Sequence, residues 1–205
     1  MPRVMEIVLG KSCTCPAAYN SPMISREPTL ERLATAQSLL LAPFGLNESH
    51  LTRALAQITA HRVDDADLYF QYTRSEGWSL EEGIVKTGSF SIDQGVGVRA
   101  VAGEKTAFAY SDDISEASLM DAAQTVRSIA AAGQNRRVKT PARKVAGSHS
   151  LYGGLDPIAT LDSTAKVDLL GRVEKLARAK DPRVVQVMAG LASEYDVVMV
   201  ARADG

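Results

Sequence analysis

A glycine-rich segment, SIDQGVGVRAVAGEKTAFAYSDDI at Ser91–Ile114, is the first place where this sequence could bind a phosphate. A phosphate-binding loop places G-x-G-x-x-G between a strand and a helix, so that backbone N–H groups surround the anion. Here Gly95 and Gly97 lack a third glycine until Gly103, and a strand-like pattern follows instead of a helix start. No Gly-Lys-Ser/Thr sequence occurs within the segment. The pattern therefore argues against a nucleotide site.

A β-hairpin accounts for the same segment. Gly103-Glu104 fits a two-residue turn with glycine first. That turn predicts that Arg99 lies opposite Phe108 and that Gly97 lies opposite Tyr110, where an aromatic ring covers the bare glycine backbone. Both faces of the hairpin are largely apolar, so we expect it inside a sheet. The Arg99 guanidinium would then be partly buried and need a carboxylate or carbonyl partner, which favours a structural role over ligand binding.

The other residue types that support catalysis or metal binding are scattered. Cys13 and Cys15 form half a metal site at best, and a reduced, solvated pair is the simpler interpretation. The three histidines lack convergent ligands, so we expect exposed or edge positions for them. They are His50, His61 and His149.

Two charged groups remain to be interpreted. Three glutamates stand near expected turns without a histidine partner, which favours solvated turn charges over acid/base residues. They are Glu76, Glu81 and Glu82. A basic run lacks interleaved aromatic residues, which argues against nucleic-acid binding. It comprises Arg136, Arg137, Lys139, Arg143 and Lys144.

Composition is that of an ordinary globular protein. The 205 residues are 45% hydrophobic and 23% charged, and the formal net charge is −1. A protein that coats nucleic acid or an anionic membrane would carry a cationic excess, so neither partner is expected. No apolar run reaches membrane-spanning length, and the short apolar run at the N-terminus contains Glu6, unlike a signal peptide. We expect a cytoplasmic protein.

The pattern of elements predicts an α+β fold, an antiparallel β-sheet meander packed with two to three α-helices. Helices are expected over residues 46–62 with Asn47 as N-cap, over 115–133, and from Asp162 or Ser163 to just before Pro182. Short strands are expected between 65 and 111, with turns at Glu76-Gly77, at 82–83 and at 88, and two more strands after Arg183 with a turn near 193–194.

The two ends of the chain suggest its domain organisation. Residues 1–27 lack periodicity and carry several prolines, which predicts a disordered tail or a mis-annotated start, with Met23 as the alternative start. Residues 28–205 then form one domain. The final Asp204-Gly205 is a strong hairpin-turn dipeptide without a return strand, which favours a truncated piece of a longer protein.

Several motifs resemble the N-terminal region of the TldD/PmbA family, and the TldD branch in particular. They are DADLYFQ (65–71), EGWSLEEGIVKTGSFSIDQGVGVRAVAGEKTAFAYSDDIS (76–115), LYGGLDP (151–157) and SEYDVVMVARADG (193–205). The resemblance implies that residues 28–205 are a TldD-like N-terminal domain, truncated before a C-terminal metallopeptidase domain. The family is also called a modulator of DNA gyrase, but nothing in the sequence suggests DNA contact.

The resemblance further implies a zinc-dependent peptidase. The family's zinc site is a His-Glu-x-x-x-His helix, in which two histidines bind the metal and the glutamate activates water. No histidine of this chain is followed by glutamate. No catalytic, cofactor-binding or metal-binding residue is therefore carried over, and zinc is expected only in the full-length family member.

The resemblance also implies partners. A TldD-type subunit pairs with a PmbA/TldE-type subunit, or with itself, and the pair degrades or matures unfolded peptides. This chain would help to form the dimer and the peptide chamber, and an exposed strand edge would hold extended peptide. Two alternatives remain: a non-catalytic interaction module or remnant that binds the partner subunit, and a nucleic-acid binder that uses the basic loop.

Overall fold

The computed structural model describes residues 3–10, 28–60, 63–131, 156 and 158–202. The chain forms two compact units. Unit 1 comprises residues 1–23, 73–92 and 150–195, and unit 2 comprises 24–72, 93–149 and 196–205. No helix among the described residues is both long and apolar enough to cross a bilayer.

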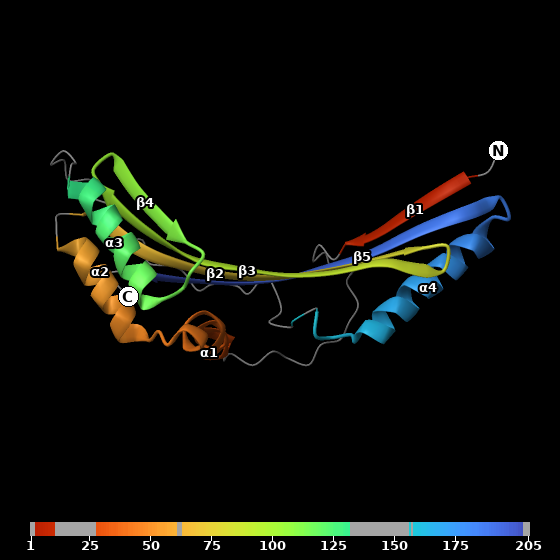
Figure 1. The fold of residues 1–205 in the computed structure, drawn as a ribbon, viewed down its shortest axis with the longest axis horizontal. Coiled ribbons are helices and arrows are strands. Elements are labelled where there is room, and N and C mark those ends of the chain that lie inside the picture. The colour runs from red at the N-terminus through yellow and green to blue at the C-terminus, as the bar shows by residue number, and fades with distance from the viewer. Residues whose placement is uncertain (1–2, 11–27, 61–62, 132–155, 157, 203–205) are drawn as a thin grey trace. The chain divides into compact units, whose positions relative to one another are not determined.

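One five-stranded sheet contributes strands to both units, in the order β1-β5-β2-β3-β4 (Figure 1). Its strands are β1 (Arg3–Gly10), β2 (Asp65–Glu81), β3 (Ile84–Ala102), β4 (Lys105–Ser111) and β5 (Val184–Arg202). Strands β2, β3 and β4 follow one another in sequence and in the sheet, which confirms the antiparallel meander. Strand β1 pairs with β5 in parallel. The sheet is thus antiparallel except at this edge.

Among the described residues four α-helices accompany the sheet, one more than the three that the sequence predicts. They are α1 (Pro28–Leu40), α2 (Glu48–Thr59), α3 (Glu116–Ala131) and α4 (Ser163–Lys180), with a 3-10 turn η1 (Ala42–Phe44) between α1 and α2. Helix α1 is the unexpected one. The predicted N-cap residues of α2 and α4 are confirmed, since Asn47 accepts backbone hydrogen bonds at the start of α2 and Asp162 accepts one from Ala165. The α+β class is confirmed.

The core of unit 2 lies between one face of its sheet and the helices α2 and α3 (Figure 1). Alternate residues of β2 point to this face, because successive side chains of a strand point to opposite sides. Leu68 and Phe70 are fully buried there, with Val98 and Ala100 from β3. Helix α3 adds Leu119, Ala123 and Val126, whose spacing of three and four residues places them on one face of the helix.

The glycine-rich segment forms the predicted hairpin in unit 2. Arg99 lies opposite Phe108 and Gly97 opposite Tyr110, as expected. Gly103 begins the turn with φ of 62°, in the left-handed region that glycine adopts without strain. A Cβ at Gly97 would lie 3.0 Å from the Phe108 ring, so the ring covers this glycine closely. The segment is therefore a piece of sheet and not a phosphate loop.

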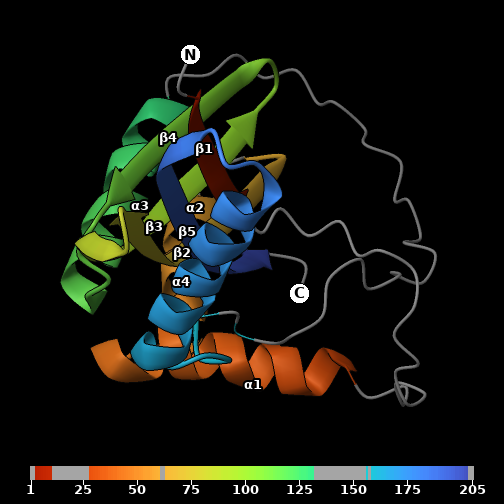
Figure 2. The same cartoon turned by 90° about the vertical axis from the view of Figure 1, so that its right-hand side faces the viewer.

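Unit 1 is built on the remaining parts of β2, β3 and β5, together with β1. Helix α4 packs along one face of this sheet, where Leu170 meets Leu80 and Ala189 (Figure 1, Figure 2). The buried face of α4 does not follow its apolar residues. Its buried positions include Lys166 and Glu174, whereas Leu176 is 63% exposed.

Three predicted turns do not exist. Strand β2 runs without a break through Glu76-Gly77, β3 runs through Gly88, and β5 runs through Ser193-Glu194. Glycine within a strand misled the prediction at two of these points. In both cases a neighbour explains the glycine: Gly88 lies under the Trp78 ring, and a Cβ at Gly77 would approach the Ser89 hydroxyl. The expected turn at Glu82-Gly83 is present.

The segment assigned to a disordered tail is described only in part. Arg3–Gly10 forms strand β1, which pairs with β5, so this part has regular structure where none was expected. Residues 11–27 lie outside the described residues, as does the dipeptide at 204–205. The domain boundaries at 27 and 28 remain a prediction.

Core burial in unit 2 gives a direct test of the fold. Leu68→Ala should lower the free energy of unfolding by about 2–5 kcal/mol, because it removes a fully buried side chain and leaves a cavity. Leu176→Ala makes the same chemical change at an exposed position and should change stability by less than about 0.5 kcal/mol. Denaturant titration followed by circular dichroism measures both. Equal losses would contradict the assigned core.

Candidate functional site

Most of the sequence candidates for metal or nucleic-acid binding lie outside the described residues. These are Cys13, Cys15, His61, His149 and the basic run between 136 and 144. The structure therefore leaves their predicted roles untested. The candidates that it does describe are His50, the three glutamates and Arg99.

His50 completes the N-terminal cap of α2. Its Nδ1 accepts a hydrogen bond from the backbone N–H of Asn47 at 3.0 Å, while the Asn47 side chain accepts from Ser49 and His50. The two residues form a reciprocal capping box. The Nε2 atom lies 3.3 Å from a carboxylate oxygen of Glu116. Both ring nitrogens thus have local partners on the helices of unit 2.

Glu76 is not the solvated turn charge that the sequence predicts. It lies within β2, and its side chain is only 9% exposed. Its Oε2 accepts a hydrogen bond from Lys166 Nζ at 2.8 Å, and its Oε1 accepts one from the Trp78 indole N–H. Lys166 is equally buried and also donates to the carbonyl of Ile158 at 2.9 Å. The pair links β2 to α4 inside unit 1.

These contacts determine the protonation of Glu76. Burial alone would raise the pKa of this carboxyl, but the hydrogen bonds from Lys166 and Trp78 outweigh it and lower the pKa. The carboxylate is therefore ionised at neutral pH, with both oxygens occupied. A general base needs a free oxygen within reach of the proton that it removes. The arrangement suits a structural ion pair better than an acid/base catalyst.

A second ion pair extends this group on the same face of β2. Arg74 binds Asp156 through an Nη2–Oδ2 hydrogen bond, and its guanidinium lies 5.8 Å from the centre of the Tyr195 ring. Asp156 also accepts backbone hydrogen bonds from Ile158 and Ala159. Burial alone would raise the pKa of Asp156, but the hydrogen bonds from Arg74 and from the two backbone N–H groups outweigh it and lower the pKa. We call Arg74, Glu76, Asp156 and Lys166 the charged cluster of unit 1.

The other glutamates are simpler. Glu81 accepts a hydrogen bond from the Gln186 side chain at 2.7 Å, across from β2 to β5. Glu82 is exposed in the turn with φ of 50°, as the sequence predicts. Neither residue approaches a histidine in any contact that the structure shows.

The sequence predicts a carboxylate or carbonyl partner for Arg99, and the structure shows a carboxylate. The Arg99 guanidinium donates to Asp67 from both Nε, at 2.8 Å, and Nη2. Asp65 lies 3.7 Å away and also accepts from Arg202 at 3.2 Å. These bonds raise the pKa of Arg99 further above its ordinary value. Arg99 thus pairs with Asp67, and Arg202 with Asp65, on the sheet face of unit 2 opposite the one that α2 and α3 cover.

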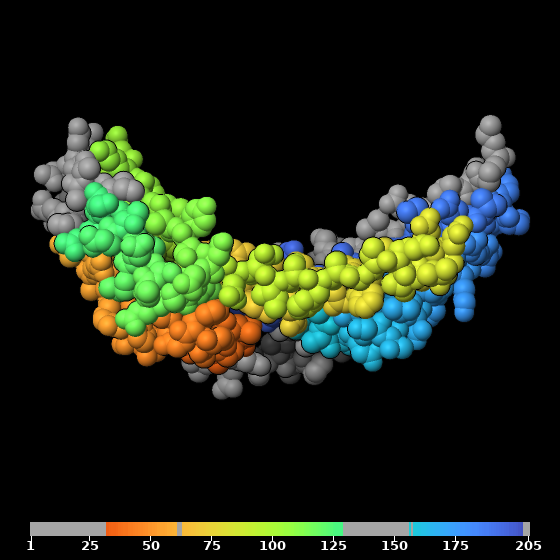
Figure 3. Space-filling model, in the orientation of Figure 1, coloured from red at the N-terminus to blue at the C-terminus, as the bar shows by residue number. Residues whose placement is uncertain are grey.

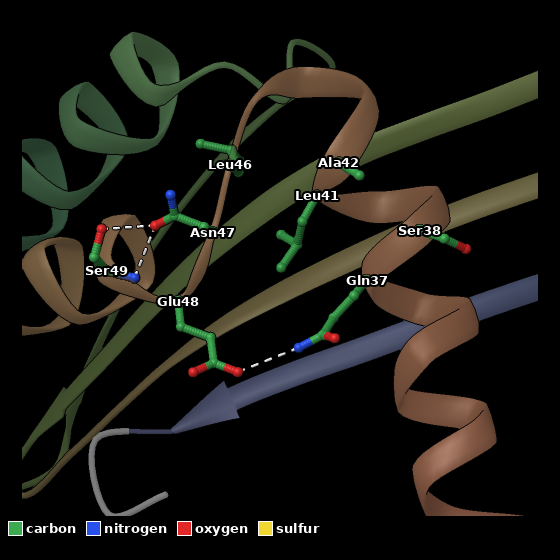
Figure 4. Close-up of a pocket in the computed structure, with 8 residues that line it drawn as sticks. All are labelled: Gln37, Ser38, Leu41, Ala42, Leu46, Asn47, Glu48 and Ser49. Carbon is green, nitrogen blue, oxygen red and sulfur yellow. Dashed lines mark hydrogen bonds between the residues drawn. The ribbon is translucent and has the colours of Figure 1, made fainter.

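One pocket of about 470 Å³ lies in unit 2, between the end of α1 and the start of α2 (Figure 4). It is lined by Gln37, Ser38, Leu41, Ala42, Leu46, Asn47, Glu48 and Ser49. Its polar groups largely bind one another: Gln37 donates to Glu48 at 3.3 Å, and Asn47 accepts from Ser49. The pocket is thus lined partly by apolar side chains and partly by polar side chains that already form hydrogen bonds with one another.

The described residues do not fit a zinc site. Zinc takes histidine, cysteine and carboxylate ligands, usually three or four together. Within the described ranges no three such side chains lie close enough to hold a metal ion. The carboxylates of the charged cluster of unit 1, and those of Asp65 and Asp67 beside Arg99, instead bind lysine or arginine side chains. No catalytic step can be assigned to these residues.

Comparison with known proteins identifies the class. The family described as PmbA/TldA metallopeptidase domain 1 matches residues 66–130. This range holds most of β2, all of β3 and β4, and nearly all of α3. The chain belongs to the PmbA/TldD family of metallopeptidases, through that family's first domain.

Two relatives with similar sequences are metalloprotease TldD homologs. A metalloprotease TldD homolog of Haemophilus influenzae is 42% identical over 173 residues, which cover 84% of this chain and 36% of that protein. The metalloprotease TldD homolog of Buchnera aphidicola subsp. Schizaphis graminum is 37% identical over 81% of this chain and 34% of that protein. The chain thus spans about a third of the length of these relatives.

Solved structures share the fold at low identity. A putative modulator of DNA gyrase from Bacteroides thetaiotaomicron aligns with a TM-score of 0.59 at 14% identity, over 78% of this chain and 37% of that one. TldE from Thermococcus kodakarensis aligns with a TM-score of 0.50 at 16% identity, over 75% and 34%. At such identity the likeness concerns the fold alone.

Sequence reasoning missed the charged cluster, although two signals pointed to it. Arg74 and Glu76 keep the alternation of Leu68 and Phe70, so an unbroken strand would place all four on the buried face. On α4, Lys166 stands four residues before Leu170 and Glu174 four after it, which places all three on one helix face. The alternation in β2 was missed because Gly77 was interpreted as a turn residue. The shared helix face of Lys166 and Glu174 was missed because charged side chains were expected to be exposed.

The buried ion pair gives a stability prediction. Lys166→Met should destabilise the protein by about 3–5 kcal/mol, because it leaves the Glu76 carboxylate buried without its cation. Lys175→Met makes the same change at an exposed position of the same helix and should have little effect. Denaturant titration compares the two. Similar small effects would mean that the pair does not form.

The pKa of Glu76 gives a pH prediction. A carboxyl whose pKa is lower in the folded than in the unfolded state stabilises the fold fully above its unfolded pKa, near 4.5. That stabilisation is lost as the pH falls through the folded value. We expect the unfolding free energy to fall below pH 4.5, and to fall less steeply in Glu76→Gln. Parallel slopes for the two proteins would contradict the assigned shift.

Proposed function

We propose that this chain is the N-terminal part of a TldD-like, zinc-dependent metallopeptidase subunit. The complete subunit would act in the cytoplasm and would degrade or mature unfolded peptides together with a PmbA/TldE-type subunit or a second copy. The observation that carries the proposal is the 42% identity to a metalloprotease TldD homolog over 84% of this chain. The TldE fold likeness is consistent with a related partner.

The chain itself would supply scaffold and not chemistry. Its sequence contains no His-Glu-x-x-x-His segment, and the carboxylates of its described charged groups are held by cations. We therefore expect no peptidase activity and no tight zinc binding from these 205 residues alone. In the complete subunit, zinc would activate the attacking water, and the residues that hold it would belong to another segment.

A non-catalytic interaction module is the second candidate function. The lack of the zinc motif favours it, because a chain without catalytic residues can still bind the partner subunit. The two candidates differ in what lies next to this sequence in the gene. Both include a PmbA/TldE-type chain as a partner.

The decisive experiment begins with the coding sequence beyond the Gly205 codon. If a His-Glu-x-x-x-His segment follows in frame, the extended protein should bind zinc and hydrolyse unfolded peptide when co-expressed with a PmbA/TldE-type chain. Its first histidine changed to alanine serves as the matched inactive control.

Two results would overturn the peptidase proposal. One is unrelated sequence or a genuine stop after Gly205, in which case co-purification of the chain with a PmbA/TldE-type subunit would support the interaction module. The other is an extended protein that contains the segment, binds zinc and still leaves peptides intact with its partner present.

A further inference from the structure

One long stretch of sheet edge in unit 1 lacks a neighbour among the described strands. In the sheet order β3 lies between β2 and β4, but β4 pairs with β3 only from Val96 onward. Among the described strands, the stretch Ile84–Ile92 therefore has a neighbour, β2, on one side only. We call it the β3 edge. In the space-filling view its yellow residues lie at the molecular surface (Figure 3).

This edge carries few of the devices that normally prevent strands from associating. Natural proteins protect sheet edges with proline, clustered charge, bulges or very short strands, because unpaired N–H and C=O groups attract another strand. The β3 edge has no proline, and Lys86 is its single charged residue. Every residue from Lys86 to Ile92 is exposed. Such an edge is a ready template for strand pairing.

The side chains of the edge differ between its two faces. Gly88 lies under the Trp78 ring, and Ser89 lies beside Gly77, so Gly88 and Ser89 point to opposite faces. By strand alternation Phe90 and Ile92 share the face of Trp78, while Ser91 shares the other face with Ser89. Phe90 is 60% exposed and Ile92 49% exposed. One face is thus apolar and the other carries hydroxyls.

We propose that the β3 edge pairs antiparallel with the β3 edge of a second copy of this chain. A two-fold axis at Phe90 would place Phe90 opposite Phe90, Ile92 opposite Gly88, and Ser89 opposite Ser91. Each contact then matches like with like: apolar groups meet on one face and hydroxyls on the other, and the branched side chain of Ile92 covers a glycine. This self-complementarity is what a two-fold interface requires.

The single charge also agrees with this partner. In that register Lys86 does not lie directly opposite the Lys86 of the other copy, so the pairing brings no like charges face to face. The inference rests on the part of the proposed function that allows self-association. It concerns this chain alone, so its failure would leave the peptidase proposal untouched.

Sedimentation of the whole chain at increasing concentration tests the pairing. We expect a monomer–dimer equilibrium, and Phe90→Lys or Ile92→Lys should weaken it by about tenfold or more. Phe90→Lys places two lysines opposite each other at the axis, and Ile92→Lys replaces an apolar contact beside the axis with a charge. Leu176→Lys is the matched control, since it adds the same charge at an exposed apolar position of α4, and it should leave the equilibrium unchanged. Circular dichroism verifies that each variant is folded.

Hydrogen exchange provides a second measurement that does not depend on the variants. Amides of the β3 edge should exchange more slowly as the concentration of the chain rises, because the second strand protects them. A chain that stays monomeric throughout would overturn the proposal. So would a dimer whose β3 amides are unprotected, or one that the lysine variants leave intact. Protection that appears only when a PmbA/TldE-type chain or peptide is added would assign the edge to that molecule instead.

Discussion

The buried ammonium group of Lys166 is the constraint on which unit 1 depends. A charge that is removed from water must be compensated where it lies, and here Glu76 and the Ile158 carbonyl do so. The helix that carries Lys166 is thereby fixed against β2, and so is the segment that contains Asp156. The ion pair adds a directional contact to the apolar packing of Leu170 against Leu80 and Ala189. It also explains why the buried face of α4 includes a charged residue.

The fold could be predicted from sequence where local chemistry and burial agree. Asn47 is a good cap and begins α2, and the turn at Gly103 gave the register of β3 and β4 because only a glycine fits it well. The long strands could not be predicted in the same way. Gly77 and Gly88 looked like turns, yet both lie within strands, where a Cβ at Gly88 would crowd the Trp78 ring and one at Gly77 would approach the Ser89 hydroxyl. Those neighbours come close only once the strands are paired.

In the candidate site, too, some contacts could be predicted from the sequence and others could not. The carboxylate partner of Arg99 was predictable because a guanidinium inside a sheet cannot remain uncompensated, and Asp67 stands in phase with it on the next strand. Glu76 was misread because the cation that it binds, Lys166, is 90 residues away in sequence. No local pattern reports a contact at that separation. The absence of the His-Glu-x-x-x-His segment, in contrast, needed only the sequence.

The two-residue turn at Glu82-Gly83 has a consequence for how the protein folds. Both residues have positive φ, as in the hairpin turns that match the twist of the strands. Once this turn has formed, β2 and β3 can pair one residue after another from the turn outward. The entropic cost of loop closure is then incurred once, for a very short loop. These strands extend into both units. If their pairing slipped by one residue, the side chains that are now buried on the face of Leu68 and Phe70 would point to the opposite face of the sheet. A turn in unit 1 thus selects which side chains enter the core of unit 2.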